Sequence, residues 1–244
     1  MNKLAHIAEF RKLLVDYHLS KPALQALSQV KLVLLVAPTS SGRNTIIREL
    51  LKTGNYHFVV SDTTRKPRDN EGVPEQNGRE YWFRTEKEML EDIKQGKFLE
   101  AAVIHNQQVS GVSVRELEKS LDENRTAISD TEVAGADNAI KYKPDTICVF
   151  VLPPSFEEWQ KRIKHRGAMT PVEFKRRMQS AIKEFEFALK RDYYHFVIND
   201  KVIDASRQIN EIVELGIRHE DQEKAGRQLA EQLLIATRQL VESL

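Results

Sequence analysis

The amino-acid sequence predicts an α/β fold with a largely parallel sheet flanked by helices. Short apolar runs alternate with capped helical segments along most of the chain, the order expected when helices connect parallel strands. The run 146–152 is almost uninterrupted in apolar character, as expected of an interior strand that is covered on both faces. The stretch 31–45, KLVLLVAPTSSGRNT, leads from a strand through a small-residue turn into a helix, and the fold is expected to be organised around it.

Composition excludes several classes of protein. A chain of 244 residues is long enough for one sizeable domain with extensions. Its 37 Lys and Arg residues nearly balance its 36 Asp and Glu residues, which argues against a general binder of nucleic acid or of anionic membranes. Cys148, the single cysteine, cannot form an internal disulfide and is expected to be buried. No apolar run approaches the length of a membrane span, so we expect a cytoplasmic protein without a membrane segment.

Two helices are expected before the organising strand. Apolar residues from Leu4 to Tyr17 recur at helical spacing. Ser20 followed by Pro22 is typical of a helix start, and this second helix is expected to continue to Leu27. After strand 31–36, a third helix begins near Arg43.

The remaining elements alternate in type. Strands are expected at 57–61, 80–83, 98–104, 126–130, 146–152 and 195–199, and helices at 86–95, 133–141, 204–215 and 221–243. Ser113 with Glu116 predicts a capping box, and helices are also expected to start at Ser155 and at Thr170. Residues 105–112, HNQQVSGV, are expected to form a loop. The last helix is expected to pack on the body of the protein or on another subunit.

The turn after the first strand has the layout of a phosphate-binding loop. A helix N-terminus offers unpaired N–H groups and a positive dipole end to an anion. The pattern G-x-x-x-x-G-K-[ST] requires two glycines, a lysine and a hydroxyl. This chain has Ala37, Gly42, Arg43 and Asn44 at those places. Taken alone, the turn is therefore either a remodelled phosphate loop or an ordinary strand-to-helix connection.

Two clusters of basic residues are further candidates for phosphate binding. The first combines hydroxyls and guanidinium groups just beyond an expected strand: Ser61, Thr63, Thr64, Arg65 and Arg68. The second lies on both sides of a glycine-containing loop, as in a lid that closes on phosphates: Arg162, Lys164, Arg166 and 175–177. The alternatives are a solvated basic turn for the first cluster and two charged helix faces for the second.

Three carboxylates are candidate ligands. Asp130 ends an expected strand, where it can hold Mg²⁺ through water, and Glu132 follows it. Glu100, within FLEA, can accept hydrogen bonds from the edge of a base. The seven histidines show no metal-ligand spacing.

In their order along the chain, six segments carry a family resemblance. They are VSDTTRKPR at 60–68, GREYWF at 78–83, GKFLE at 96–100, VLPPS at 151–155, the pair KRIKHRG and KRRM at 161–167 and 175–178, and VIND at 197–200. Together they resemble guanylate kinases, the P-loop enzymes that phosphorylate GMP from ATP. The resemblance extends from about Lys31 to Gly216 and leaves both terminal helical segments outside it.

This resemblance implies an architecture. It comprises a P-loop NTPase-type parallel sheet flanked by helices, a small mixed-β region that binds the nucleoside monophosphate, and a helical lid. The expected boundaries are a helical extension at 1–29, a guanylate kinase-like domain at 30–217 and a C-terminal helix at 218–244. Within the domain, 62–112 is the GMP-binding region and 155–190 the lid region.

The resemblance also implies roles for individual residues. The expected ATP-binding loop is Ala37, Pro38, Thr39, Ser40, Ser41, Gly42, Arg43, Asn44 and Thr45. The expected catalytic cations are Arg43, Arg162, Arg166 and Arg177. The expected GMP-binding residues are Ser61, Arg65, Arg68, Tyr81, Glu100, Ser110, Val112, Asp130 and Glu132. Asn44 and Asp130 are the expected contacts of the Mg²⁺ that accompanies ATP, through water.

Several positions depart from the family pattern. Ser110 stands where a phosphate-binding tyrosine is expected, Val112 replaces a hydroxyl, and residues around 73–76 are extra. In the phosphate loop, Ala37 and Ser40 replace glycines, and Ser40 is strained if its φ is positive.

Two functions follow. The leading one is a kinase acting on GMP or dGMP, and the alternative is a weak or inactive relative that binds a nucleotide or a protein partner. The chain is expected to be a monomer or a homodimer, possible contacts being the terminal helices, and not to bind nucleic acid.

Overall fold

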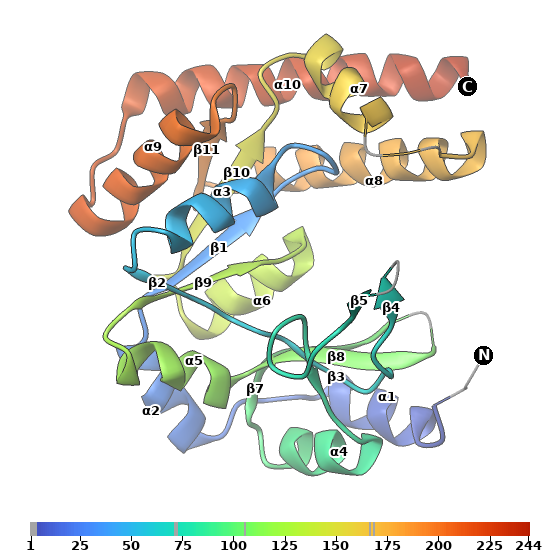
Figure 1. Cartoon of the computed structure of the whole chain (residues 1–244), viewed down its shortest axis with the longest axis vertical. Coiled ribbons are helices and arrows are strands. Elements are labelled where there is room, and N and C mark those ends of the chain that lie inside the picture. Colours follow the sequence, from blue (N-terminus) through green and yellow to red (C-terminus); the bar gives the residue numbers. More distant parts are fainter. Residues whose placement is uncertain (1–3, 71–72, 105, 166, 168) are drawn as a thin grey trace. The chain divides into compact units, whose positions relative to one another are not determined.

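The computed structural model describes residues 4–70, 73–104, 106–165, 167 and 169–244. It confirms the α/β fold class, with a parallel sheet flanked by helices and a separate mixed sheet (Figure 1). The chain forms two compact units. The first comprises Met1–Lys31, Tyr56–Ala127 and Asp137–Asp145, and the second comprises Leu32–Asn55, Ile128–Ala136 and Thr146–Leu244.

The second unit contains four neighbouring strands of a five-stranded sheet, in the order β11-β10-β1-β9. These strands are β1 (Leu32–Val36), β9 (Thr126–Asp130), β10 (Ile147–Leu152) and β11 (Tyr194–Ile198). Val33 pairs with Ile147 and Cys148 with Tyr194, both in parallel register. Every residue of β1 is buried and Cys148 is fully buried, so the expectations of an interior apolar sheet and of a buried cysteine are confirmed.

Five helices belong to this unit: α3 (Arg43–Leu51), α7 (Phe156–His165), α8 (Pro171–Leu189), α9 (Val202–Leu215) and α10 (Glu220–Ser243). Two of the expected caps are confirmed. Ser155 Oγ accepts a hydrogen bond from Glu158 N at 3.1 Å, and Thr170 Oγ1 accepts one from Glu173 N at 3.2 Å. Each bond satisfies an N–H group that the first helical turn leaves unpaired.

The last helix packs on its own chain, along α8 and β11 (Figure 1). Gly226 faces the backbone of Phe196 so closely that an added Cβ would lie 2.8 Å from Phe196 Cβ. Arg227 donates to the carbonyls of Leu189 (2.8 Å) and Arg191 (3.1 Å), and its guanidinium lies over the Phe196 ring. One face of α10 is therefore buried within the protomer, while the oligomeric state stays a prediction.

The first unit is built on a mixed sheet in the order β6-β3-β8-β7. Its strands are β3 (Asp62–Thr63), β6 (Trp82–Phe83), β7 (Phe98–Ile104) and β8 (Gln108–Ser113). Shorter strands are β2 (Tyr56–Phe58) and the pair β4 (Asp69–Asn70) and β5 (Val73–Pro74). Its helices are α1 (Ile7–Val15), α2 (Lys21–Gln29), α4 (Glu86–Lys94) and α5 (Val114–Asp122). Helix α6 (Val133–Tyr142) contributes residues to both units.

Two local expectations are wrong. Residues 108–113 form β8, the antiparallel partner of β7, instead of a loop, because Val109, Gly111 and Val112 are buried within the sheet despite their polar neighbours. The expected capping box at Ser113 is absent, since no side-chain cap bond forms there. The Glu116 carboxylate instead accepts bonds from Val60 N and Trp82 Nε1, so packing against the sheet overrides the local cap.

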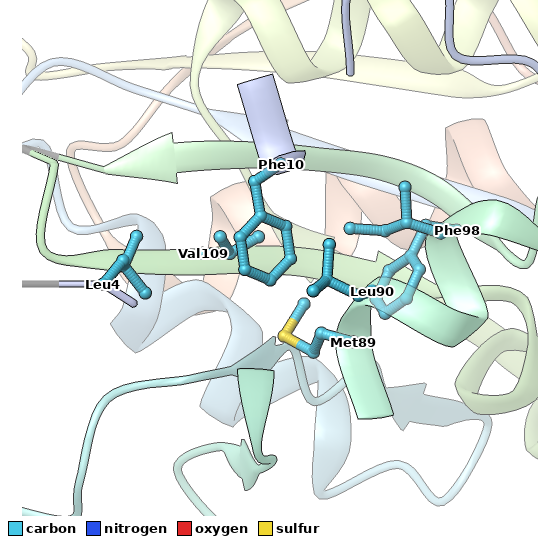
Figure 2. Packing of buried hydrophobic residues seen from close by; sticks show 7 residues of the cluster. Leu4, Phe10, Met89, Leu90, Phe98 and Val109 are labelled. Atoms are coloured by element: carbon cyan, nitrogen blue, oxygen red, sulfur yellow. The ribbon is translucent and has the colours of Figure 1, made fainter. Parts of the chain in front are cut away.

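The core of the first unit joins the N-terminal helix to the sheet. Figure 2 shows Phe10 of α1 in one buried cluster with Met89 and Leu90 of α4 and the sheet residues Phe98 and Val109. Phe10 and Phe98 are both fully buried. The apolar spacing of the N-terminal segment thus predicted both the helix and the face that it buries.

Candidate functional site

In the second unit, the stretch between β1 and α3 lines a cavity of about 490 Å³. All nine residues of the expected ATP-binding loop, Ala37 to Thr45, line it, together with Arg48, Arg162 and His165. Helix α3 begins directly after Gly42, so its first N–H groups and the positive end of its dipole are at this loop. The residues that the sequence singled out as an ATP-binding loop therefore line one cavity, while their role stays a prediction.

The loop backbone is left-handed at two positions, one of which is not a glycine. Ser40 has a φ of 62° and Gly42 a φ of 91°. Because the left-handed region is costly for a residue with a Cβ, the expected strain at Ser40 is confirmed. At Gly42 a Cβ would also displace the Asn199 amide from its bond to Ser41 O, so glycine is strongly favoured there.

Neighbouring helices and strand ends hold the loop in place. Trp159 Nε1 of α7 donates to Thr39 O at 2.7 Å, and Asn199 Nδ2 donates to Ser41 O at 2.8 Å. Within the described part of the chain, Ser40 Oγ and Ser41 Oγ are buried without a hydrogen-bond partner. Buried hydroxyls of this kind favour a ligand that brings acceptor oxygens, such as a phosphate.

Arg43, at the place of the usual lysine, is held by the protein. Its Nη2 donates to Asp130 Oδ2 at 2.6 Å and its Nη1 to Thr131 O at 2.9 Å. Its Nε also lies 3.5 Å from Asn44 Oδ1. The structure thus brings together three residues that the sequence singled out, Arg43, Asn44 and Asp130, but as partners of one another.

The expected lid arginines also have carboxylate partners. Arg162 pairs with Glu158 at 3.2 Å and donates to Asn199 O at 3.0 Å. Arg177 pairs with Glu173 at 2.6 Å, and its Nη1 lies 3.4 Å from Thr39 Oγ1. Arg166, the fourth expected catalytic cation, lies outside the described residues.

Sequence reasoning missed a buried acid near this loop. Burial, together with the charge of Glu132, raises the pKa of Glu184 on α8 to about 7, although the charge of Arg43 opposes the shift. Glu184 Oε2 is buried without a hydrogen-bond partner among the described residues. A single glutamate within a charged helical pattern gives no sequence signal, so only the structure identifies it.

Asn44 and Asp130 suit a Mg²⁺ ion that they contact through water rather than directly. Mg²⁺ usually keeps several waters and takes one or two carboxylates together with substrate phosphates, which matches one carboxylate and one amide. Within the described part of the chain, no group of three or more acidic, histidine or cysteine side chains has metal-binding geometry. Asp130 Oδ2 is already taken by Arg43. These residues fit a magnesium ion that arrives with a nucleotide and is contacted through water.

In the first unit, Arg65 is the centre of a second polar cluster. Its Nη1 and Nη2 donate to the two oxygens of Glu75 at 2.5 and 2.8 Å, and its guanidinium lies 4.6 Å from the centre of the Tyr81 ring. The exposed fractions of the two side chains are only 11% and 8%. The bond from Glu75 raises the pKa of Arg65.

Glu75 was not among the predicted site residues. The Arg65 bond lowers the pKa of Glu75 to about 2, helped by a bond from the main-chain N–H of Arg68 at 2.8 Å. The sequence marked this segment as extra residues in the expected GMP-binding region. The sequence feature that could have indicated Glu75 is therefore a carboxylate in the extra residues that follow Arg65 and Arg68.

The mixed sheet places further candidates on one face. Glu100 of β7 pairs with Val112 of β8, and Ala102 pairs with Ser110. Side chains of directly paired residues share a face, and so do residues two apart on a strand. Glu100, Val112 and Ser110 therefore lie on the same face. The Ser110 hydroxyl donates to Thr63 Oγ1 at 2.9 Å, in the strand after Ser61.

Comparison with known proteins identifies the family to which the chain belongs. The model of the family described as guanylate kinase matches residues 29–215. The chain belongs to the guanylate kinase family. The guanylate kinase of Clostridium tetani (strain Massachusetts / E88) is 34% identical over 75% of this chain and 84% of the relative. That of Porphyromonas gingivalis (strain ATCC BAA-308 / W83) is also 34% identical, over 75% of this chain and 96% of the relative.

A solved structure supports the fold. The guanylate kinase from Anaplasma phagocytophilum aligns with a TM-score of 0.56 and 22% identity, covering 84% of this chain and 95% of that one. The guanylate kinase match leaves α1 and most of α2 before it, and α10 after it. Among the helices that the structure describes, none has the length and apolar character needed to cross a bilayer.

Proposed function

We propose that the protein transfers the γ-phosphoryl group of ATP to GMP or dGMP. Membership of the guanylate kinase family makes the chain a kinase, that is, a phosphotransferase. The observation that carries the choice of acceptor is the mixed sheet. It presents a carboxylate, Glu100, on the same face as Ser110 and Val112, next to the strand that leads to Arg65.

Donor binding is assigned to the loop from Ala37 to Thr45. Its backbone N–H groups, the helix dipole and the buried hydroxyls of Ser40 and Ser41 suit the oxygens of a polyphosphate. Arg43, Arg162, Arg166 and Arg177 supply positive charge to the transferring group.

Acceptor binding is assigned to the first unit and to β9. Ser61, Arg65, Arg68 and Tyr81 hold the phosphate of the acceptor, with Ser110 near them. Glu100 accepts hydrogen bonds from guanine N1–H and the 2-amino group, a donor pair that adenine lacks. Val112 lines the base pocket beside Glu100, and Asp130 and Glu132 contribute carboxylates.

The reaction needs no covalent enzyme intermediate. An oxygen of the GMP phosphate attacks the γ-phosphorus, the bond from that phosphorus to the β–γ bridging oxygen breaks, and ADP leaves. Positioning and charge neutralisation carry the catalysis. Mg²⁺ bound to the ATP phosphates supplies further neutralisation of charge, and Asn44 and Asp130 would contact it through water. We assign this activity to purine nucleotide metabolism in the cytoplasm.

A coupled assay of ADP release tests the proposal. GMP, dGMP, AMP, CMP and UMP are offered to the wild type, to Arg65→Ala and to the control Arg79→Ala. Arg79 is an exposed arginine of the same region that pairs with its neighbour Glu80 and donates to Pro74 O at 3.4 Å. Turnover with guanine nucleotides that falls at least about 100-fold in Arg65→Ala, and little in Arg79→Ala, is expected. No turnover of any acceptor at micromolar enzyme refutes the kinase proposal.

The alternative, a weak or inactive relative, makes a different prediction. It requires GMP binding without ATP binding, because the altered loop is on the donor side. Separate measurements of the two affinities distinguish it from the kinase. The relatives with the family's name do not favour it.

A further inference from the structure

Tyr17 joins the N-terminal extension to the acceptor sheet. It follows α1 and lies outside the segment that matches the family. Its hydroxyl donates to Phe98 O and accepts from Phe98 N, each at 2.7 Å. One side chain thus satisfies both main-chain groups of the first residue of β7.

Strand β7 is irregular at this point. Phe98 pairs with Ser113 and Glu100 with Val112, so two steps along β7 correspond to one step along β8. This is the count of a β-bulge, in which the extra residue disrupts the ladder and leaves backbone groups without their strand partner. Phe98 keeps its register partner Ser113, but β7 is the edge strand of the sheet, so Tyr17 supplies a partner for Phe98 on the open edge, directly beside the extra residue.

The bulge decides where Glu100 points. In a regular strand, residues two apart share a face, so Phe98 and Glu100 would point the same way. Phe98 instead belongs to the buried cluster seen in Figure 2, against which Ala101 also packs. As the neighbour of Ala101, Glu100 faces the opposite side, together with Val112. The irregularity therefore lets the strand bury Phe98 and still present Glu100.

The hydroxyl of Tyr17 suits this position. It must donate and accept at once, which a protonated phenol can do. Burial raises the pKa of Tyr17 to about 12, so the donor proton remains in place at neutral pH. On its other side, Tyr142 donates to the Tyr17 carbonyl at 3.0 Å and fixes its main chain.

We propose that Tyr17 is a positioning residue for acceptor recognition, which holds the bulge at Phe98 so that Glu100 is aimed at the guanine base. The inference rests on the proposed function, since the role of Glu100 belongs to it. It assigns a function to the N-terminal extension, which becomes part of the base-recognition apparatus.

The test measures binding rather than turnover. Calorimetry gives the dissociation constants of GMP, IMP and ATP for the full chain, for Tyr17→Phe and for Phe10→Leu. IMP lacks the 2-amino group and so uses only one of the two bonds to Glu100. Tyr17→Phe is expected to weaken GMP binding about tenfold, to reduce the preference for GMP over IMP, and to leave ATP binding unchanged. Hydrogen exchange at the Phe98 amide, without nucleotide, is expected to become faster.

Phe10→Leu is the matched control. It loosens the packing of α1 on the same strand but leaves both bonds to Phe98 in place. It should lower thermal stability at least as much as Tyr17→Phe without changing the GMP-to-IMP preference. An unchanged preference in Tyr17→Phe, or an equal change in Phe10→Leu, overturns the inference. If the wild type binds GMP but transfers no phosphoryl group, only the proposed function is refuted. If the wild type does not bind GMP, both the proposed function and the role of Tyr17 are refuted.

Discussion

Arg43→Lys tests whether the departure in the phosphate loop controls ATP affinity. In the structure, the guanidinium makes one bond to Asp130 at 2.6 Å and one to Thr131 O at 2.9 Å. For Arg43 to contact a phosphate, at least part of this arrangement must be given up. A lysine ammonium is a compact point charge that cannot reproduce the two-pronged contact.

The magnitude follows from the exposure of the pair. The side chains of Arg43 and Asp130 are 23% and 33% exposed, so solvent screens their attraction. A partly exposed pair of this kind contributes about 1 kcal/mol. If ATP must displace it, Arg43→Lys should tighten ATP binding about fivefold and lower the stability of the free protein by about the same 1 kcal/mol.

Calorimetry with ATP and urea unfolding measure the two effects. Arg238→Lys is the control, because Arg238 pairs with Glu186 at the same 2.6 Å but does not line the cavity of the phosphate loop. It should leave ATP affinity unchanged. Unchanged or weaker ATP binding in Arg43→Lys would show that the pair does not compete with phosphate.

Three further predictions concern other parts of the chain. Glu75→Gln should cost about 2 kcal/mol of stability, measured by urea unfolding, because it leaves the largely buried Arg65 without its charged partner. Glu184 has a pKa above that of the unfolded chain, so the folded state retains the proton and stability falls as pH rises from 4.5 to about 7. Urea unfolding should therefore show that the free energy of unfolding of Glu184→Gln, relative to that of the wild type, is higher at pH 8 than at pH 5. Gly226→Ala should cost about 1–3 kcal/mol, because its Cβ meets Phe196, and an unchanged urea midpoint would contradict the packing of α10.

The parallel sheet could be predicted because its strands are signalled locally. The strand 126–130 was predicted with the bounds that the structure has. The run 146–152 contains β10, since apolar residues fill both faces of an interior strand. The cap at Thr170 was equally readable, because a hydroxyl, a proline and an acid stand at fixed spacing. Strand β8 was not, because it interleaves Gln108 and Ser110 with buried residues, and its pairing with β7 is a tertiary contact.

For the candidate site, the sequence indicated which residues are candidates but not which residues they contact. It singled out Arg43 and Asp130 separately, as a phosphate contact and a magnesium contact. The structure instead makes them an ion pair. The partners Glu75 and Glu184 could not be found, because a carboxylate becomes informative only when folding places it against an arginine or in a buried position.

The same physical device occurs in both units. Arg43 and Arg65, which we assign to the donor and the acceptor phosphates, are each held by a carboxylate in the described structure. A carboxylate and a phosphate offer a guanidinium similar pairs of oxygens, so the partner pre-orients the arginine and also competes for it. The net effect depends on how many N–H groups remain. Among the hydrogen bonds between described residues, Arg65 uses its two terminal nitrogens, for Glu75 and Lys66 O, whereas Arg43 directs all three nitrogens to protein oxygens. Competition should therefore dominate at Arg43 and pre-orientation at Arg65, which makes the donor loop the more costly of the two sites to occupy.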